Sequence, residues 1–192
     1  MPNATIPLPP PETVGGSPLL NAIKARQSSR EFAARPLPPQ LLSNLLWATI
    51  GLSHPERDGL TVPNARNRHE IDVFVITPEG AYRYDIQNHA LKTVLTGDIR
   101  ALAGKQDFVA TAPLNLIYVA DYSRMPDLNT EQQLVYSSTH VGFSAQNAYL
   151  FCTSAGLATV VRGSIDREAL GQALGLTTQQ RIILGQSVGF PA

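Results

Sequence analysis

The longest periodic segment of the chain runs from about Glu131 to Ala155, and it constrains the fold more than any other feature. Small and apolar residues recur along one face at helical spacing, and aromatic residues occupy other faces. The first group is Val141, Ala145, Ala148, Cys152 and Ala155, and the second is Phe143, Tyr149 and Phe151. A helix that is apolar on several sides must be covered on several sides. The segment therefore predicts a central core helix, ended by Gly156.

Shorter helix and strand patterns alternate along the rest of the chain. Helices are predicted over 19–26, with Ser17 as N-cap and Pro18 at the first helical position, and over 38–50, 99–103 and 166–175. Strands are predicted over 71–76, 81–86, 114–119, 158–161 and 182–188, with a tight turn at 78–80. The polar stretch 53–70 predicts a loop. Strands interleaved with helices predict a mixed sheet in an α+β sandwich.

Residues 1–16 are rich in proline, show no periodicity and predict an extended arm. Such an arm is either a solvated tail or a segment that lies on a partner subunit. Residues 17–192 contain no internal repeat and predict a single domain. The first residues lack the basic and apolar regions of a signal peptide, so a cytoplasmic protein is the default expectation. A mature exported chain whose leader is missing from the sequence is the alternative.

The charge balance argues against several classes of partner. The 192 residues carry 15 basic and 15 acidic side chains, so the formal net charge is zero. A general nucleic-acid or membrane-surface binder would show a basic excess. No apolar run approaches the roughly 20 residues of a transmembrane helix.

The sequence also contains few of the motifs that mark metal sites or common classes of enzyme. Cys152 is the one cysteine, so an intrachain disulfide and a cysteine-based zinc site are excluded. Its place on the apolar stripe predicts an inert core thiol. The four histidines do not pair at metal-ligand spacing, and we interpret His69 as a loop residue and His140 as a helix-surface residue. No glycine-rich dinucleotide motif or P-loop is present, and no metal site is predicted.

A local basic motif begins where the first predicted helix ends, in Arg26-Gln27-Ser28-Ser29-Arg30-Glu31-Phe32. Two guanidinium groups four residues apart, with two hydroxyls between them, suit a phosphate, because arginine offers a fixed fork of charge-assisted donors. The alternative is a helix C-terminus whose cations favour the helix dipole. Spacing alone leaves both interpretations open.

Four stretches in order along the chain resemble the nitroreductase family of flavoproteins. They are 26–32, the loop Pro63-Asn64-Ala65-Arg66-Asn67-Arg68, the helix segment 146–150 with 155–159 behind it, and the terminal Gly189-Phe190-Pro191. Residues 45–51 and 80–84 are similar to the subgroup of peptide-azoline dehydrogenases. The resemblance covers about residues 17 to 191. It implies an α+β fold with a mixed, largely antiparallel central sheet sandwiched by helices.

The resemblance also implies roles for particular residues toward flavin mononucleotide (FMN). Arg26, Gln27, Ser28 and Arg30 would contact the phosphate and the ribityl chain. Pro63, Asn64, Ala65 and Asn67 would lie near the isoalloxazine of the neighbouring subunit. Gln106 would touch the ribityl chain or the pyrimidine edge, and Arg162-Gly163 would present a backbone N–H to flavin N5. Asn64-Ala65 departs from the usual Ser-Ser or Ser-Ala.

The implied activity is a ping-pong hydride transfer through flavin N5, from NADH or NADPH to a small-molecule acceptor. Nitroaromatics, quinones and enones are the acceptor classes of the family, and the active sites would lie at the interface of a homodimer. No catalytic side chain is predicted, because the cofactor carries the chemistry. Two alternatives remain: a flavin-dependent dehydrogenase of a ring in a peptide or small molecule, and a flavin-binding protein without turnover.

Overall fold

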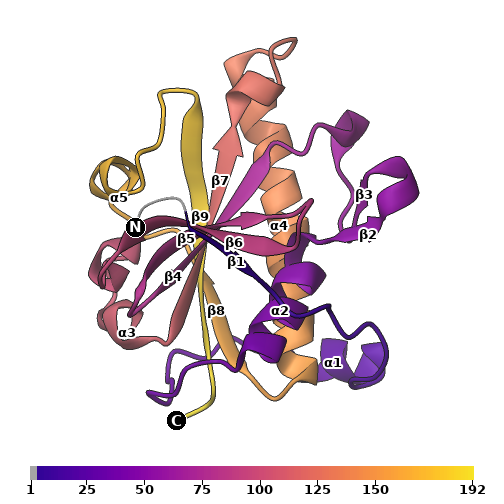
Figure 1. Cartoon of the computed structure of the whole chain (residues 1–192), viewed down its shortest axis with the longest axis vertical. Helices are drawn as coiled ribbons and strands as arrows, with labels where there is room; N and C mark the ends of the chain where they lie inside the picture. The colour runs from indigo at the N-terminus through magenta and orange to yellow at the C-terminus, as the bar shows by residue number, and fades with distance from the viewer. Residues whose placement is uncertain (1–3) are drawn as a thin grey trace.

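A seven-stranded sheet separates two layers of helices in the computed structural model, which describes residues 4–192 (Figure 1). Its strands are β1 (Thr5–Pro7), β4 (Ile71–Thr77), β5 (Gly80–Asp85), β6 (Ala90–Thr96), β7 (Leu114–Asp121), β8 (Ala158–Arg162) and β9 (Gln180–Gly189). They lie in the order β1-β6-β5-β4-β7-β9-β8, and every neighbouring pair is antiparallel. The α+β fold with a largely antiparallel sheet is thus confirmed.

Helices cover both faces of this sheet. The helices α1 (Leu19–Ala25), α2 (Pro39–Ile50) and α4 (Thr130–Ser154) lie on one side in Figure 1, and α3 (Asp107–Thr111) and α5 (Arg167–Ala173) on the other. Side chains of a strand alternate between the faces. Val73 and Val75 accordingly join the hydrophobic core under α2 and α4, while Phe74 and Ile76 join a second core under α3 and α5. The predicted sandwich therefore has two cores, one on each face.

The central helix α4 begins and ends close to the predicted residues. Asn129 caps its first turn: the Asn129 side chain accepts from the Gln132 N–H, and the Gln132 side chain accepts from the Asn129 N–H. At the other end, Gly156 has a φ of +69°, a left-handed conformation that glycine adopts without a steric penalty. The first helix differs from the prediction, because Pro18 and not Ser17 is its N-cap, and the Ser17 N–H donates to Ser154 Oγ.

The stretch 53–70 contains regular structure, whereas its polar composition predicted only a loop. It includes a small antiparallel pair, β2 (Leu52–His54) and β3 (Gly59–Leu60), and short 3₁₀ turns at Pro55–Arg57 and Ala65–Asn67. Further 3₁₀ turns occur at Arg100–Ala103, in place of the predicted short helix, and at Tyr122–Arg124. The sequence pattern also missed β6, since its hairpin turns through His89, a histidine with a φ of +45°, instead of through glycine.

The N-terminal arm lies on its own chain. Residues Thr5–Pro7 form the edge strand β1 beside β6, although proline-rich segments rarely signal a strand. Beyond it, the carbonyl of Pro9 accepts from Ser43 Oγ and lies 3.1 Å from His89 Nε2. The Glu12 N–H donates to the side chain of Asn44, on the same helix as Ser43. The arm from residue 4 is therefore bound to β6 and α2. None of the helices within residues 4–192 has the length and apolarity to cross a membrane.

Candidate functional site

The segment 26–30 is a strap that crosses the end of the sheet beside β8. Arg26 follows the last residue of α1, and its N–H still donates to the Ala22 carbonyl. Three residues later, the N–H of Ser29 donates to the Thr159 carbonyl at 3.0 Å. This bond fixes the backbone of the strap to the edge strand of the sheet.

Tyr149 of α4 holds the strap from below, a role that the sequence did not reveal. Its hydroxyl lies 2.8 Å from Ser28 Oγ and accepts a hydrogen bond from the Val161 N–H at 2.9 Å. The guanidinium of Arg26 stands 5.2 Å above the centre of its ring, within cation–π distance. Strap, helix and edge strand therefore meet at one buried tyrosine.

The two arginines of the strap are available to an anion. Among the described residues, neither Arg26 nor Arg30 takes part in an ion pair. Gln27, Ser28 and Arg30 are exposed, and Arg26 is partly exposed. The predicted phosphate contacts thus lie together on one accessible strap, and neither of its guanidinium groups is paired with a carboxylate of the described residues.

The predicted isoalloxazine loop, 63–69, is held in a strained conformation by polar contacts. Arg66, Asn67 and His69 all have a φ between +51° and +57°, which costs about 1–2 kcal/mol per non-glycine residue. Hydrogen bonds of Asn64 offset part of this cost, because its side chain accepts from the His69 N–H at 3.0 Å and donates to Glu70 at 2.8 Å. The Asn67 side chain donates to the Asp58 carbonyl, in the turn between β2 and β3. The loop is therefore a fixed element of the structure.

A buried pair of Glu70 and His140 supports this loop, so the interpretation of His140 as a helix-surface residue was wrong. His140 Nδ1 hydrogen-bonds Glu70, and its Nε2 accepts from the Ala65 N–H at 3.2 Å. The partner, Glu70, lies 70 residues away along the chain, which explains why spacing alone did not reveal the pair. Burial acts to raise the pKa of the Glu70 carboxyl, but hydrogen bonds from His140 and Asn64 outweigh it and lower this pKa.

The strap and the loop contact the same helix at two separate places. The strap packs on Tyr149, while the loop packs on His140, nine positions earlier. Nine residues of α-helix rise about 13 Å and make two and a half turns, so these side chains leave the helix on opposite sides. Within one chain, the two predicted halves of the flavin site are thus apart.

Gln106 and Gly163 lie on neighbouring loops, because the Lys105 N–H donates to the Ser164 carbonyl. Gln106 Oε1 is buried and has no hydrogen-bond partner among the described residues. Gly163 is exposed directly after β8. Both predicted residues can therefore offer polar groups at the open end of β8.

The side chain of Arg162 points into the protein and cannot reach a ligand. Its guanidinium bonds Ser187 Oγ, Asn115 Oδ1 and the Ala103 carbonyl. A Cβ atom at Gly104 or Gly185 would come within 2.5 or 2.8 Å of it, so only glycine leaves it room. Burial lowers the pKa of Arg162 to about 10. Arg162 can serve a cofactor with its backbone alone.

Large apolar side chains are exposed along α1 and α4. Leu20 is the most open of those on α1, with 77% of its surface accessible. The others are Leu19, Ile23, Leu134, Val135, Tyr136 and Phe143. An open groove of about 590 Å³ lies between α1, α4 and the β2–β3 pair. Part of the surface of the central helix is thus left uncovered by its own chain.

Comparison with known proteins identifies the family. The model of the nitroreductase family matches residues 23–190. The chain belongs to the nitroreductase family. A curated relative from Methanocaldococcus jannaschii, itself named a nitroreductase, is 36% identical in an alignment 149 residues long that covers 72% of this chain and 75% of the relative. Membership of this family makes the chain an oxidoreductase, as the sequence motifs had indicated.

Solved structures of nitroreductases show the same fold. A protein from Ralstonia eutropha JMP134, described as a nitroreductase, is 40% identical, with a TM-score of 0.93 over 98% of this chain and 90% of its own. The NADPH:FMN oxidoreductase of Vibrio harveyi, solved with NAD⁺, is 21% identical, with a TM-score of 0.68 over 90% of this chain and 68% of its own. At this lower identity the likeness shows the fold alone.

Proposed function

We propose that this nitroreductase binds FMN and passes electrons from NADH or NADPH to a small-molecule acceptor. The observation that carries the proposal is the strap, where the guanidinium groups of Arg26 and Arg30, on either side of Ser28, form no ion pair among the described residues. The Vibrio harveyi protein, which has the same fold, is an NADPH:FMN oxidoreductase and was solved with a nicotinamide nucleotide.

The residues present fit the parts of a flavin nucleotide. A phosphate needs several charge-assisted donors held in place. The strap offers two arginines and the Ser28 hydroxyl, which Tyr149 holds, while the Thr159 carbonyl holds the backbone N–H of Ser29. The orphaned Oε1 of Gln106 is an acceptor that suits a hydroxyl or an N–H of the cofactor. The exposed backbone at Gly163 lies on the adjoining loop.

When bound, the flavin would supply two-electron transfer between a nicotinamide and an acceptor. The chain's own residues then bind and orient. Arg26 and Arg30 neutralise the phosphate, and Tyr149 keeps the strap in position. The loop around Asn64, held by the buried Glu70–His140 pair, forms one wall of the place where donor and acceptor alternate.

We further propose that a second copy of the chain completes each site. The two predicted halves lie on opposite sides of α4 within one chain, so a single flavin could reach both only if one half came from a partner. The exposed apolar residues of α1 and α4 are of the kind that oligomer interfaces cover. A two-fold dimer buries the same face of both copies and creates two equivalent sites. The N-terminal arm gives no evidence for a dimer, because it lies on its own chain.

The absorbance spectrum of the purified protein tests the proposal. We expect the near-ultraviolet and blue bands of an oxidised flavin, and their loss when NADH or NADPH is added without oxygen. Release by denaturation and mass measurement should identify FMN. A colourless protein that takes up no FMN would refute the cofactor. A yellow protein that neither nicotinamide bleaches would refute the electron donor and favour the ring dehydrogenase or the flavin-binding protein without turnover.

A further inference from the structure

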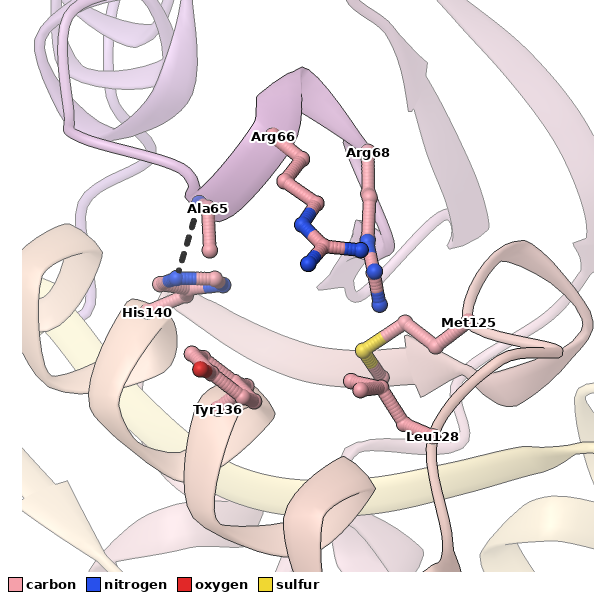
Figure 2. A pocket seen from close by; sticks show the side chains of 7 residues that line it. All are labelled: Ala65, Arg66, Arg68, Met125, Leu128, Tyr136 and His140. Carbon is pink, nitrogen blue, oxygen red and sulfur yellow. Dashed lines mark hydrogen bonds between the residues drawn. The ribbon is translucent and has the colours of Figure 1, made fainter.

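A small cavity opens beside the loop 63–69, and two arginines contribute to its wall. It has a volume of about 40 Å³ and is lined by Ala65, Arg66, Arg68, Met125, Leu128, Tyr136 and His140. Figure 2 shows the guanidinium groups of Arg66 and Arg68 projecting from the loop into the space between Tyr136 and Met125. The lining therefore contains two cations and no carboxylate.

Arg68 provides the main evidence that the cavity binds a ligand. Its side chain is only 11% exposed, and Arg68 Nη1 is buried with no hydrogen-bond partner among the described residues. A buried guanidinium donor without an acceptor is costly, so such a group is typical of a site that a ligand or water completes. The cavity has room for about three water-sized atoms, which is the size of a carboxylate group.

Asp127 already neutralises part of this charge from outside the cavity. A single oxygen, Asp127 Oδ2, accepts from Arg66 Nη1 at 2.9 Å and from Arg68 Nη2 at 2.7 Å. The pair of arginines therefore keeps one net positive charge and its inward-facing donors. Glu70 does not compete for them, because its two oxygens are taken by His140 and Asn64.

The rest of the wall is apolar or aromatic. Met125 and Leu128 face the guanidinium groups, and Tyr136 stands beside them (Figure 2). A ligand that matches this wall has a small anionic end on a flat or apolar body.

We propose that Arg66 and Arg68 recognise the carboxylate of an aromatic acid, and that this acid is the electron acceptor. Assignment to the acceptor rests on the proposed function, which places the loop beside the flavin. Carboxylated nitroaromatics are then the favoured class, over neutral nitroaromatics of the same size.

The first test is calorimetric binding of benzoate to the purified protein, with benzamide as a neutral probe of similar shape. We expect benzoate to bind at least about tenfold more tightly than benzamide, the effect of one charge-assisted hydrogen bond. Arg68→Gln should abolish this preference. Arg66→Gln should also reduce the preference for benzoate. The Arg66 side chain is 75% exposed, so this substitution should not unfold the chain. Arg181→Gln, an exposed arginine elsewhere on the surface, should leave the preference unchanged.

Asp127→Asn separates recognition from a structural role of the arginines. Removing this carboxylate frees donors on both arginines, so benzoate should bind more tightly. If the arginines only hold the loop, the same change should weaken binding or leave it unaltered. Equal binding of benzoate and benzamide to the unaltered protein would overturn the proposal, as would weaker or unchanged benzoate binding in Asp127→Asn.

The second test compares kcat/KM for 4-nitrobenzoate and its methyl ester. The acid should be preferred, and Arg68→Gln should reduce that preference at least about tenfold. If Arg68→Gln instead changes KM for NADH or NADPH, the cavity binds an anionic group of the electron donor. That result would overturn its role in binding the acceptor. Benzoate binding that requires Arg68, in a protein whose flavin is reduced by NADH or NADPH but which reduces no nitroaromatic, would refute the acceptor assignment alone. A flavin that neither nicotinamide reduces would refute the proposed function as well. Normal turnover without preference for the acid would refute the cavity's role alone.

Discussion

Tyr149→Phe is the most informative single substitution, because it removes one hydroxyl and keeps the ring beneath Arg26. The hydroxyl accepts from the Val161 N–H and bonds Ser28 Oγ. Each bond contributes about 0.5–1.5 kcal/mol net, so the loss should lower the free energy of unfolding by about 2 kcal/mol. For a chain of this length that corresponds to about 4–8 °C in Tm.

The same substitution should weaken the binding of FMN, since it frees the strap that presents Arg26 and Arg30. A loosened phosphate site must be ordered again on binding, and we expect a loss of about tenfold in FMN affinity. Flavin fluorescence quenching measures this, with riboflavin as the ligand that lacks the phosphate. The advantage of FMN over riboflavin should shrink.

Tyr82→Phe is the matched control, because its hydroxyl on β5 makes no hydrogen bond among residues 4–192. It should change neither Tm nor FMN affinity. If Tyr149→Phe behaves like this control, the tyrosine does not hold the strap and the argument from its hydrogen bonds is wrong.

Three further substitutions or conditions test separate parts of the account. Arg30→Ala should weaken FMN about tenfold to 150-fold, the effect of one charge-assisted bond, and leave riboflavin unchanged; equal losses for both ligands would exclude a phosphate contact. Cys152 lies in the core, so Cys152→Ala should lower the free energy of unfolding by about 1 kcal/mol. Burial also raises the pKa of the Cys152 thiol, which keeps it unreactive, so the variant should keep full activity. Inactivation of a folded protein would contradict this. Burial lowers the pKa of His89 below its usual value. The neutral ring therefore stabilises the bound arm above about pH 6.5. This stabilisation is lost as the pH falls through the lowered pKa. The protection factors of the β1 amides, which are corrected for the intrinsic pH dependence of exchange, should then be lower at about pH 5 than at about pH 8; equal protection factors would exclude His89 as the cause.

Local signals in the sequence predicted the elements whose stabilising contacts are local. The long helix was visible because its apolar spacing and Gly156 are close together in the chain. The strap was visible for the same reason, since Arg26, Ser28 and Arg30 are near neighbours. Asp166, the first residue of the predicted helical segment 166–175, caps the short helix α5, since its side chain accepts from the Ala169 N–H.

Contacts between distant segments were not predictable from spacing. Tyr149 meets Ser28 across 121 residues, and His140 meets Glu70 across 70, so neither partner was apparent. The edge strand β1 was missed because its stability comes from β6 and α2 and not from its own proline-rich sequence.

The central claim, a flavin site shared between two chains, can be tested by mixing two defective variants. One chain carries Arg26→Ala and Arg30→Ala, and the other carries Asn67→Ala. Each must first be shown to be nearly inactive alone. Unfolded together and refolded with FMN at equal amounts, they should give mixed dimers as about half of the total.

Each mixed dimer would contain one intact site and one site with all of the lesions. About a quarter of all sites should therefore regain bound flavin and NAD(P)H oxidation. If strap and loop serve the same flavin within one chain, every site carries a lesion. No recovery, with mixed dimers confirmed by mass, would contradict the shared site.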